Sequence, residues 1–155
     1  MKYRKKYYLQ QKVEFEDCDL QGIVHHPKIL CFLERARLQA LNEENIGYKK
    51  MLEKKICFVI SDINIRFSFP LKLDDVFWIT TEVIKTYKNY IKIYQTICFE
   101  KILDDPMNEK HPVSFCKIRL CLVNIEDLSP IHEDHEIFKE LNYDKEKTTK
   151  QRKKL

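Results

Sequence analysis

Hydrophobic and polar residues alternate from residue 7 to residue 16, with the period of two that is typical of a half-buried strand. One side of this stretch carries Tyr7, Leu9, Gln11, Val13 and Phe15, and the other carries Tyr8, Gln10, Lys12, Glu14 and Glu16. The period changes after a turn at Gly22. From Pro27, which suits a first helical turn, apolar residues recur at Ile29, Leu33, Ala36 and Ala40 until Gly47 supplies a stop signal. This pattern predicts a strand and then a helix of about 18 residues, roughly 27 Å long.

Four further runs rich in Ile, Val, Thr, Tyr and Phe predict strands over residues 57–69, 76–86, 90–100 and 113–124. The connection 87–89 is short enough for an antiparallel hairpin, whereas 101–112 indicates a longer loop. A short helix is expected over 134–141. The order of elements predicts an α+β domain in which a mostly antiparallel five-stranded sheet packs against one long central helix.

The composition is that of one folded domain. With 155 residues, 44% of them hydrophobic, the chain can bury a single core, which we expect to lie within residues 1–142. Residues 143–155 are basic, hold much of the net charge of +4, and are predicted to form a disordered tail. Apolar runs are far shorter than the roughly 18 residues that cross a bilayer. Polar residues 10–12 interrupt any signal-peptide core, so the sequence predicts a cytoplasmic protein with no membrane span.

Two residue types exclude several classes of protein. The six cysteines form no C-x-x-C pair and have irregular intervals, which favours reduced thiols over a zinc site or a disulfide framework. The two glycines, Gly22 and Gly47, cannot form a P-loop or a Rossmann fingerprint. Mononucleotide hydrolysis and hydride transfer on those scaffolds are therefore excluded.

The junction between the first strand and the helix carries the candidate chemistry, with carboxylates at Asp17 and Asp19 and histidines at His25 and His26. Free N–H groups at a helix start, together with the positive end of the helix dipole, would stabilise negative charge on a substrate oxygen. By residue frequency alone, either aspartate caps a turn or the helix, and the histidines are ordinary turn residues. A metal site has weak support, because adjacent histidines rarely converge on one ion.

Taken whole, the pattern resembles the signature of the hotdog-fold acyl-CoA thioesterases of the 4-hydroxybenzoyl-CoA thioesterase and YbgC-like type. The resemblance is carried by Phe15-Glu16-Asp17-Cys18-Asp19, Gly22-Ile23-Val24, His26 and Glu34-Arg35-Ala36-Arg37. A second block, residues 58–69 followed by Pro70 and Leu73-Asp74-Asp75, is also similar, so the resemblance covers about residues 7–125. The chain departs from the family at His25, usually a tyrosine, and at Leu20-Gln21-Gly22, usually a smaller turn.

The resemblance implies roles for individual residues. Asp19, the second acid of the Asp-x-Asp motif, would be the catalytic carboxylate, acting as nucleophile or general base, while Asp17 would be structural. His26 would be the catalytic histidine, and its backbone N–H would polarise the thioester carbonyl. Candidate substrate-binding residues are Gly22, Ile23, Val24, His25, Asp62 and Lys88.

The resemblance also implies a homodimer, often doubled to a homotetramer, in which two sheets join edge to edge and active sites lie between subunits. The strand over 58–69, with Asp62, Asn64 and Arg66 on one face, is the candidate partner-facing element. Lysines near the predicted hairpin are candidates for contacts with coenzyme A phosphates: Lys85, Lys88 and Lys92.

We therefore expect a thioesterase that hydrolyses an acyl-CoA to free acid and CoA without a metal or redox cofactor. The alternatives are a thioesterase for acyl carrier protein (ACP) or a hydratase on the same fold, and a non-catalytic acyl-CoA binding module. Nucleic acid is not an expected partner, because no stripe of aromatic and basic residues is evident outside the tail.

Overall fold

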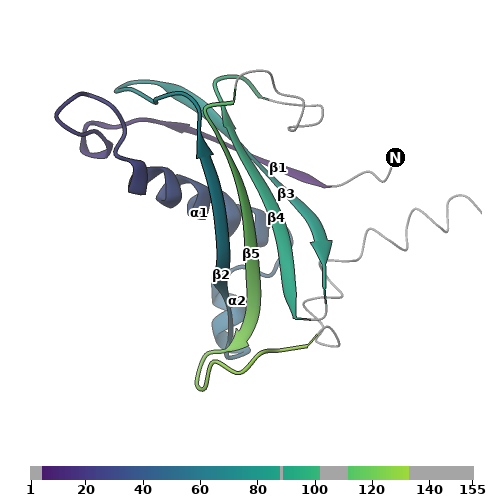
Figure 1. Cartoon of the computed structure of the whole chain (residues 1–155). Coiled ribbons are helices and arrows are strands. Elements are labelled where there is room, and N and C mark those ends of the chain that lie inside the picture. The colour runs from purple at the N-terminus through teal and green to yellow at the C-terminus, as the bar shows by residue number, and fades with distance from the viewer. Residues whose placement is uncertain (1–4, 88, 102–111, 133–155) are drawn as a thin grey trace, which may run out of the picture.

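The computed structural model of the chain describes residues 5–87, 89–101 and 112–132 (Figure 1). Its elements are β1 (Lys6–Lys12), the 3-10 helix η1 (Phe15–Asp17), α1 (His26–Glu43), α2 (Tyr48–Glu53), β2 (Ile56–Phe67), β3 (Val76–Thr86), β4 (Tyr90–Cys98) and β5 (Ser114–Asn124). The predicted helix over 134–141, the tail and Lys88 lie outside the described residues.

The five strands form one sheet in the order β1-β3-β4-β5-β2, and every pairing is antiparallel. Because directly paired residues share a face, the register gathers the apolar positions on one side. Ile79 pairs with Ile97, and Ile93 pairs with Ile118; all four side chains are buried.

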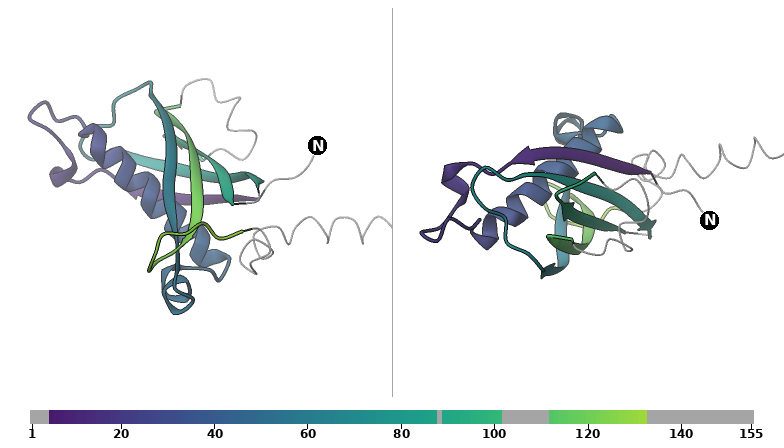
Figure 2. Two further views of the ribbon diagram at one scale, coloured as in Figure 1. Left: turned by 60° about the horizontal axis from the view of Figure 1, so that its bottom comes forward. Right: turned by 90° about the horizontal axis from the view of Figure 1, so that it is seen from above.

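Helix α1 lies across this apolar side, which we call the inner face of the sheet (Figures 1 and 2). The ring centroids of Phe32 on α1 and Phe77 on β3 are 5.1 Å apart. Ala36 and Ala40 are also buried in the contact, and their small side chains allow the helix to approach closely. The predicted α+β domain, with a five-stranded antiparallel sheet around one long helix, is confirmed.

Midway along α1, a buried polar network ties the helix to the sheet. The guanidinium of Arg37 donates a hydrogen bond of 2.9 Å to Oε1 of Gln95 on β4. Nε2 of Gln95 donates to the carbonyl oxygen of Leu33 and to the hydroxyl of Thr81, both at 2.9 Å. Burial lowers the pKa of Arg37, and the nearby Glu34 opposes that effect.

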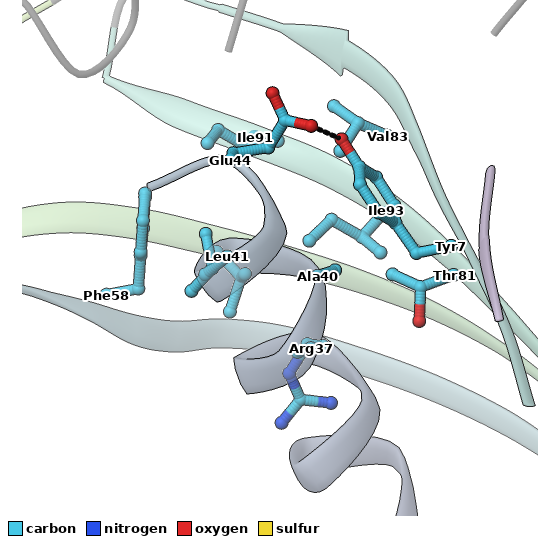
Figure 3. Close-up of a pocket in the computed structure, with 11 residues that line it drawn as sticks. Tyr7, Arg37, Ala40, Leu41, Glu44, Phe58, Thr81, Val83, Ile91 and Ile93 are labelled. Carbon is cyan, nitrogen blue, oxygen red and sulfur yellow. Dashed lines mark hydrogen bonds between the residues drawn. The ribbon is translucent and has the colours of Figure 1, made fainter. Parts of the chain in front are cut away.

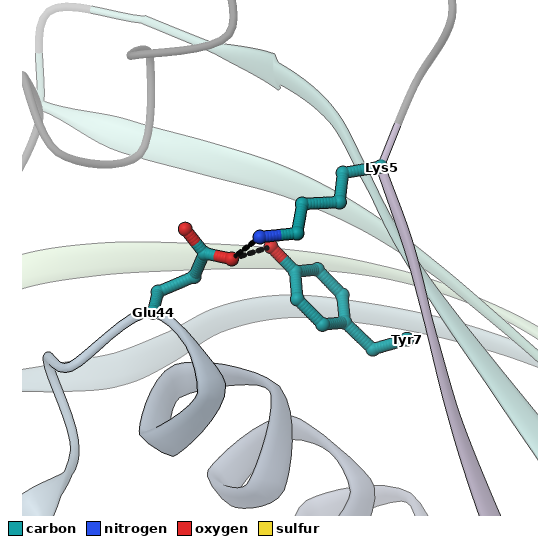
Figure 4. A network of polar contacts seen from close by, with 3 residues as sticks. All are labelled: Lys5, Tyr7 and Glu44. Carbon is teal, nitrogen blue, oxygen red and sulfur yellow. Dashed lines mark hydrogen bonds and ion pairs between the residues drawn. The ribbon is translucent and has the colours of Figure 1, made fainter.

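At the C-terminal end of α1, Glu44 pairs with Lys5 and accepts a hydrogen bond of 2.7 Å from the hydroxyl of Tyr7 (Figure 4). Tyr7 and Glu44 help to enclose a small, mainly apolar cavity between α1 and the inner face, with Arg37 at its far end (Figure 3). Its volume of about 20 Å³ is room for about one water molecule. This cavity is therefore too small for an acyl group.

The prediction that the first strand reaches residue 16 is wrong beyond Lys12. The backbone N–H of Glu14 donates to Oδ2 of Asp17 at 2.9 Å, and the N–H of Asp17 donates to the carbonyl oxygen of Glu14 at 3.0 Å. These local bonds replace strand pairing and form η1. Phe15, assigned by its spacing to the same side as Tyr7, is instead 83% exposed.

Helix α2 was not predicted, because its six residues are too few to show a helical period. It follows Gly47 and places Met51 in the core. Among the described residues, no helix is long and apolar enough to cross a membrane.

Strand β2 lies at one end of the sheet and pairs with β5 along one edge only. Its inner face exposes a row of apolar side chains: Ile60 is 49%, Ile63 is 39% and Phe67 is 50% exposed. A long apolar edge strand is a ready template for pairing with another strand. The edge of β2 is therefore open and apolar in the described chain.

The other side of the sheet, which we call the outer face, carries aromatic and basic side chains together. Tyr94 of β4 pairs with Lys117 of β5, and Lys92 pairs with Arg119. The expectation that no such stripe exists outside the tail is therefore wrong. Along each strand, residues of the outer face alternate with core residues. They are therefore separated in the sequence but lie together on one face of the sheet.

Candidate active site

The loop between η1 and α1 is held in a tight, hairpin-like turn. Cys18 and Val24 form an isolated antiparallel bridge, and the N–H of Asp19 donates to the carbonyl oxygen of Ile23 at 2.9 Å. The N–H of Gly22 donates back to the carbonyl oxygen of Asp19 at 3.0 Å. Gly22 has a φ of 71°, the left-handed region in which glycine carries no steric penalty.

The carboxylate of Asp19 is exposed and caps this turn. Its Oδ1 accepts hydrogen bonds from the N–H of Gln21 at 2.8 Å and of Ile23 at 3.3 Å. Oδ2 has no hydrogen-bond partner within the described part of the chain. The turn-capping role is thus present, and it leaves one carboxylate oxygen available for chemistry.

Asp17 is 4% exposed and supports the loop from inside. Its Oδ2 accepts the bond from Glu14 described above, and its Oδ1 lies 3.6 Å from Nζ of Lys28 in the first turn of α1. Its carbonyl oxygen accepts a hydrogen bond of 2.9 Å from the N–H of His25. All of its acceptor groups therefore serve the local structure.

Helix α1 begins at His26 with an available backbone donor. His25 is the N-cap residue, and its carbonyl oxygen accepts a bond of 2.8 Å from the N–H of Lys28. Pro27 has no N–H to offer. The N–H of His26 makes no hydrogen bond to any described residue, so it stands at the positive end of the helix dipole as a free donor.

A groove with a volume of about 260 Å³ opens beside this helix start. It is lined by Ile23, Val24, His26, Ile29, Phe67, Ser68, Phe69, Pro70, Leu71, Val113 and Ser114. The ring centroids of His26 and Phe67 are 6.4 Å apart in an edge-on arrangement. A mainly apolar groove with a free amide at its rim can hold an apolar chain and bind an oxygen atom beside it.

Ser114 is a polar residue of this groove that the sequence did not point to. Its hydroxyl is fully buried and has no hydrogen-bond partner among the described residues. Nothing in the sequence marked it, because it lies in an apolar strand far along the chain from the motif.

The candidate residues occupy different places. Ile23, Val24 and His26 line the groove, while Asp19, Gly22 and His25 belong to the loop beside it and are not among its lining residues. Asp62 is exposed on β2, and in the strand register it lies opposite Arg119 of β5. Lys88 lies outside the described residues, and Lys92 is on the outer face.

The thiol of Cys18, which lies between the two motif aspartates in the sequence, is not activated as a nucleophile. Burial, followed by the charges of Asp17 and Asp19, raises the pKa of the Cys18 thiol. A raised pKa keeps the sulfur protonated near neutral pH.

Comparison with known proteins identifies the family of the chain. The model of the thioesterase superfamily (4HBT) matches residues 21–103. Acyl-CoA thioesterase YbgC of Helicobacter pylori is 30% identical over 131 residues, covering 84% of this chain and 95% of that protein. Acyl-CoA thioester hydrolase YbgC of Escherichia coli is 31% identical over 72 residues, 46% of this chain and 54% of that protein. The chain thus spans about half the length of this E. coli relative.

Solved structures share the architecture. DHNA-CoA thioesterase from Staphylococcus aureus has a TM-score of 0.76 at 16% identity, covering 97% of this chain and 96% of that chain. The sheet, the central helix and this neighbour define a hotdog fold. The chain belongs to the thioesterase superfamily, and its curated relatives are of the YbgC-like type.

Proposed function

We propose that the protein is an acyl-CoA thioesterase that releases a free acid and CoA. The observation that carries the proposal is the free backbone N–H of His26 at the rim of the 260 Å³ groove, beside the loop that holds Asp19. A thioester carbonyl at this rim would accept the hydrogen bond, and its oxygen would gain negative charge during attack. The helix dipole and the amide would both stabilise that charge.

The proposed chemistry needs one carboxylate. Asp19 attacks the carbonyl carbon, or removes a proton from a water molecule that does so. The carbon–sulfur bond then breaks, and CoA leaves as a thiolate that takes up a proton. In the first route, water hydrolyses the acyl-aspartyl anhydride and restores Asp19. The His26 ring, next to the groove, would orient the acyl group or the water.

The site is proposed to be complete only in a dimer. Asp19 does not line the groove of its own chain, while the open apolar edge of β2 invites a second copy. Pairing of two β2 strands would bury Ile60, Ile63 and Phe67 and set each groove against the partner. Asp19 would then act in a cleft closed by the other subunit.

The groove also favours a class of acyl group. Its lining is apolar apart from His26, Ser68 and Ser114, and the buried hydroxyl of Ser114 lacks a partner. A substrate with a hydroxyl or oxo group at the matching position would satisfy it, and a plain hydrocarbon would leave it unpaired. We therefore expect hydroxylated or oxo-acyl thioesters to be preferred.

The test is the release of free thiol from a panel of acyl-CoAs that includes short, long, aromatic and hydroxylated acyl groups, with the matching acyl-ACPs beside them. The proposal expects thiol release from at least one acyl-CoA and a lower preference for hydroxylated groups in Ser114→Ala. Faster turnover of every acyl-ACP would favour the carrier protein as substrate. Binding of acyl-CoA with no thiol released would indicate a non-catalytic binding module.

A further inference from the structure

We propose that the outer face of the sheet binds single-stranded nucleic acid. The proposal rests on a set of side chains that we call the outer-face stripe. It consists of the rings of Tyr8, Trp78, Tyr87, Tyr90, Tyr94 and Phe115 and the cations Lys92, Lys101, Lys117 and Arg119. None of these residues lines the groove of the candidate active site.

The first cluster of the stripe lies on β1 and β3. Nζ of Lys101 is 4.6 Å from the ring centroid of Tyr8 and 5.2 Å from that of Trp78. Lys101 is exposed, and both rings are half-buried. The two rings therefore offer apolar surface together with a cation.

The second cluster lies on β4 and β5. The rings of Tyr94 and Phe115 meet edge-on with centroids 5.5 Å apart, and Nζ of Lys117 lies 5.6 Å from the first centroid and 5.8 Å from the second. Lys117 is exposed. One cation thus serves two rings.

The third cluster lies at the hairpin end of β3 and β4. The rings of Tyr87 and Tyr90 stack with centroids 4.3 Å apart. Arg119 lies 5.0 Å from the Tyr90 centroid, and Lys92 lies 5.3 Å from the Tyr87 centroid. Because Lys92 and Arg119 are directly paired across β4 and β5, two positive charges meet at this end.

Rings and cations alternating on a sheet suit a chain of bases and phosphates. Bases stack on aromatic side chains regardless of sequence, and lysine or arginine side chains neutralise the phosphates between them. Exposed lysines are long and mobile, so each cation can leave its ring for a phosphate while a base takes its place. Sheets that bear aromatic rings bind single-stranded RNA in the same way.

The charges also argue against other occupants. Asp62, which is exposed, lies opposite Arg119 in the strand register. Lys101, Lys117 and Arg119 outnumber its carboxylate, so a second copy placed face to face would bring an excess of like charges together. An acidic polypeptide would satisfy the cations but would make no use of the rings. A single strand of nucleic acid uses both, because its bases stack on the rings and its phosphates pair with the cations.

The test uses the only tryptophan of the chain, Trp78, which belongs to the stripe. The full-length protein is titrated with an oligouridine of about 12 nucleotides, within the size range of single-strand sites. Base stacking is expected to quench Trp78 fluorescence, and a duplex of equal length is expected to bind more weakly. Four cations predict that the logarithm of the binding constant falls with the logarithm of salt concentration with a slope of about −2 to −3.

Two variants separate charge from stacking. Lys117→Gln with Arg119→Gln is expected to weaken binding at least about ten-fold at low salt and to flatten the salt dependence. Tyr94→Leu keeps every charge and is expected to weaken binding by about five-fold or more. Lys49→Gln with Lys50→Gln removes two charges from α2 and should leave binding unchanged. Thioesterase activity should be the same in the Lys117 and Arg119 variant, which separates this proposal from the proposed function.

Several results would overturn the proposal. These are an oligouridine that leaves Trp78 unquenched at low salt, variants of the stripe that bind like the wild type, and polyglutamate that binds as tightly as the oligouridine. Displacement of the oligouridine by stoichiometric CoA would also overturn it, because the stripe would then be a site for the nucleotide part of CoA. Circular dichroism of each variant confirms that the fold is kept.

Discussion

The backbone N–H of His25 donates a hydrogen bond of 2.9 Å to the carbonyl oxygen of Asp17. This bond joins the N-cap of α1 to the end of η1, so the loop that carries Asp19 leaves and returns at neighbouring points. The buried side chain of Asp17 supports the same junction, because its carboxylate contacts the N–H of Glu14 and the ammonium of Lys28. The free N–H of His26 and the carboxylate of Asp19 are therefore placed by one hydrogen-bonded junction.

Replacing the buried acid should loosen this junction. Asp17→Ala leaves the N–H of Glu14 and the ammonium of Lys28 without their partner, and is expected to lower the free energy of unfolding by about 1–3 kcal/mol. Urea denaturation measures the loss. Asp127→Ala removes an exposed carboxylate that caps a surface turn and should cost less. Equal losses of unfolding free energy in the two variants would show that Asp17 stabilises only its own turn.

The polar network under α1 should matter for stability and not for chemistry. Gln95→Leu removes the partner of the Arg37 guanidinium and of the Leu33 carbonyl, and leaves a buried charge unpaired. We expect a loss of about 2–4 kcal/mol in the free energy of unfolding. Arg37→Met with Gln95→Leu removes both partners and should recover part of that loss. If the double variant loses as much unfolding free energy as the two single variants lose together, Arg37 and Gln95 are not coupled.

The edge of β2 should control assembly. Ile63→Lys places a charge in the proposed strand-to-strand contact, and is expected to give a monomer by light scattering after size exclusion, with little remaining thioesterase activity. Leu52→Lys introduces the same charge at an exposed apolar residue of α2 and should change neither property. Full activity from a monomeric Ile63→Lys variant would rule out a site completed by a second copy.

Cys116 should make stability depend on pH in the alkaline range. Burial raises the pKa of its thiol from 9.0 to about 11, while the Arg37 charge opposes that rise. The folded state therefore keeps its proton over a pH range where the unfolded state loses it. The contribution to stability is complete below about pH 9 and falls by about 2–3 kcal/mol as pH rises through 11.

This pH effect can be isolated by difference, since lysines and tyrosines also titrate in that range. Unfolding free energies of the wild type and Cys116→Ala are compared at about pH 8 and about pH 10.5. The wild type should lose more stability than the variant between the two values. An equal loss in both proteins would show that the Cys116 proton is not held by the fold.

The first strand and α1 could be predicted because each has a clear period, and the other four strands because they are rich in β-branched and aromatic residues. The strand predicted over residues 76–86 coincides with β3 (Val76–Thr86), and α1 begins one residue before the expected Pro27. The error at residues 13–16 has a physical cause. Alternation persists there, but the side chain of Asp17 offers the backbone of Glu14 a closer partner than a neighbouring strand does.

The candidate site was only partly predictable. The motif placed Asp19 and His26 at the same junction before the helix, because local spacing fixes local geometry. The groove also needs Phe67 and Ser114, which come from two strands far apart in the sequence and meet only through sheet register. The outer-face stripe was missed for the same reason, since every second residue of its strands points into the core.

The central claim, thioester hydrolysis by the Asp19 carboxylate, is tested most directly by steady-state release of CoA from the best acyl-CoA substrate in Asp19→Asn and Asp127→Asn. Both aspartates cap exposed turns through Oδ1, which accepts the N–H two residues later, and asparagine preserves that bond. We predict that Asp19→Asn lowers kcat by at least about 100-fold while the fold is unchanged, and that Asp127→Asn has wild-type kcat. Wild-type kcat in Asp19→Asn would contradict the account.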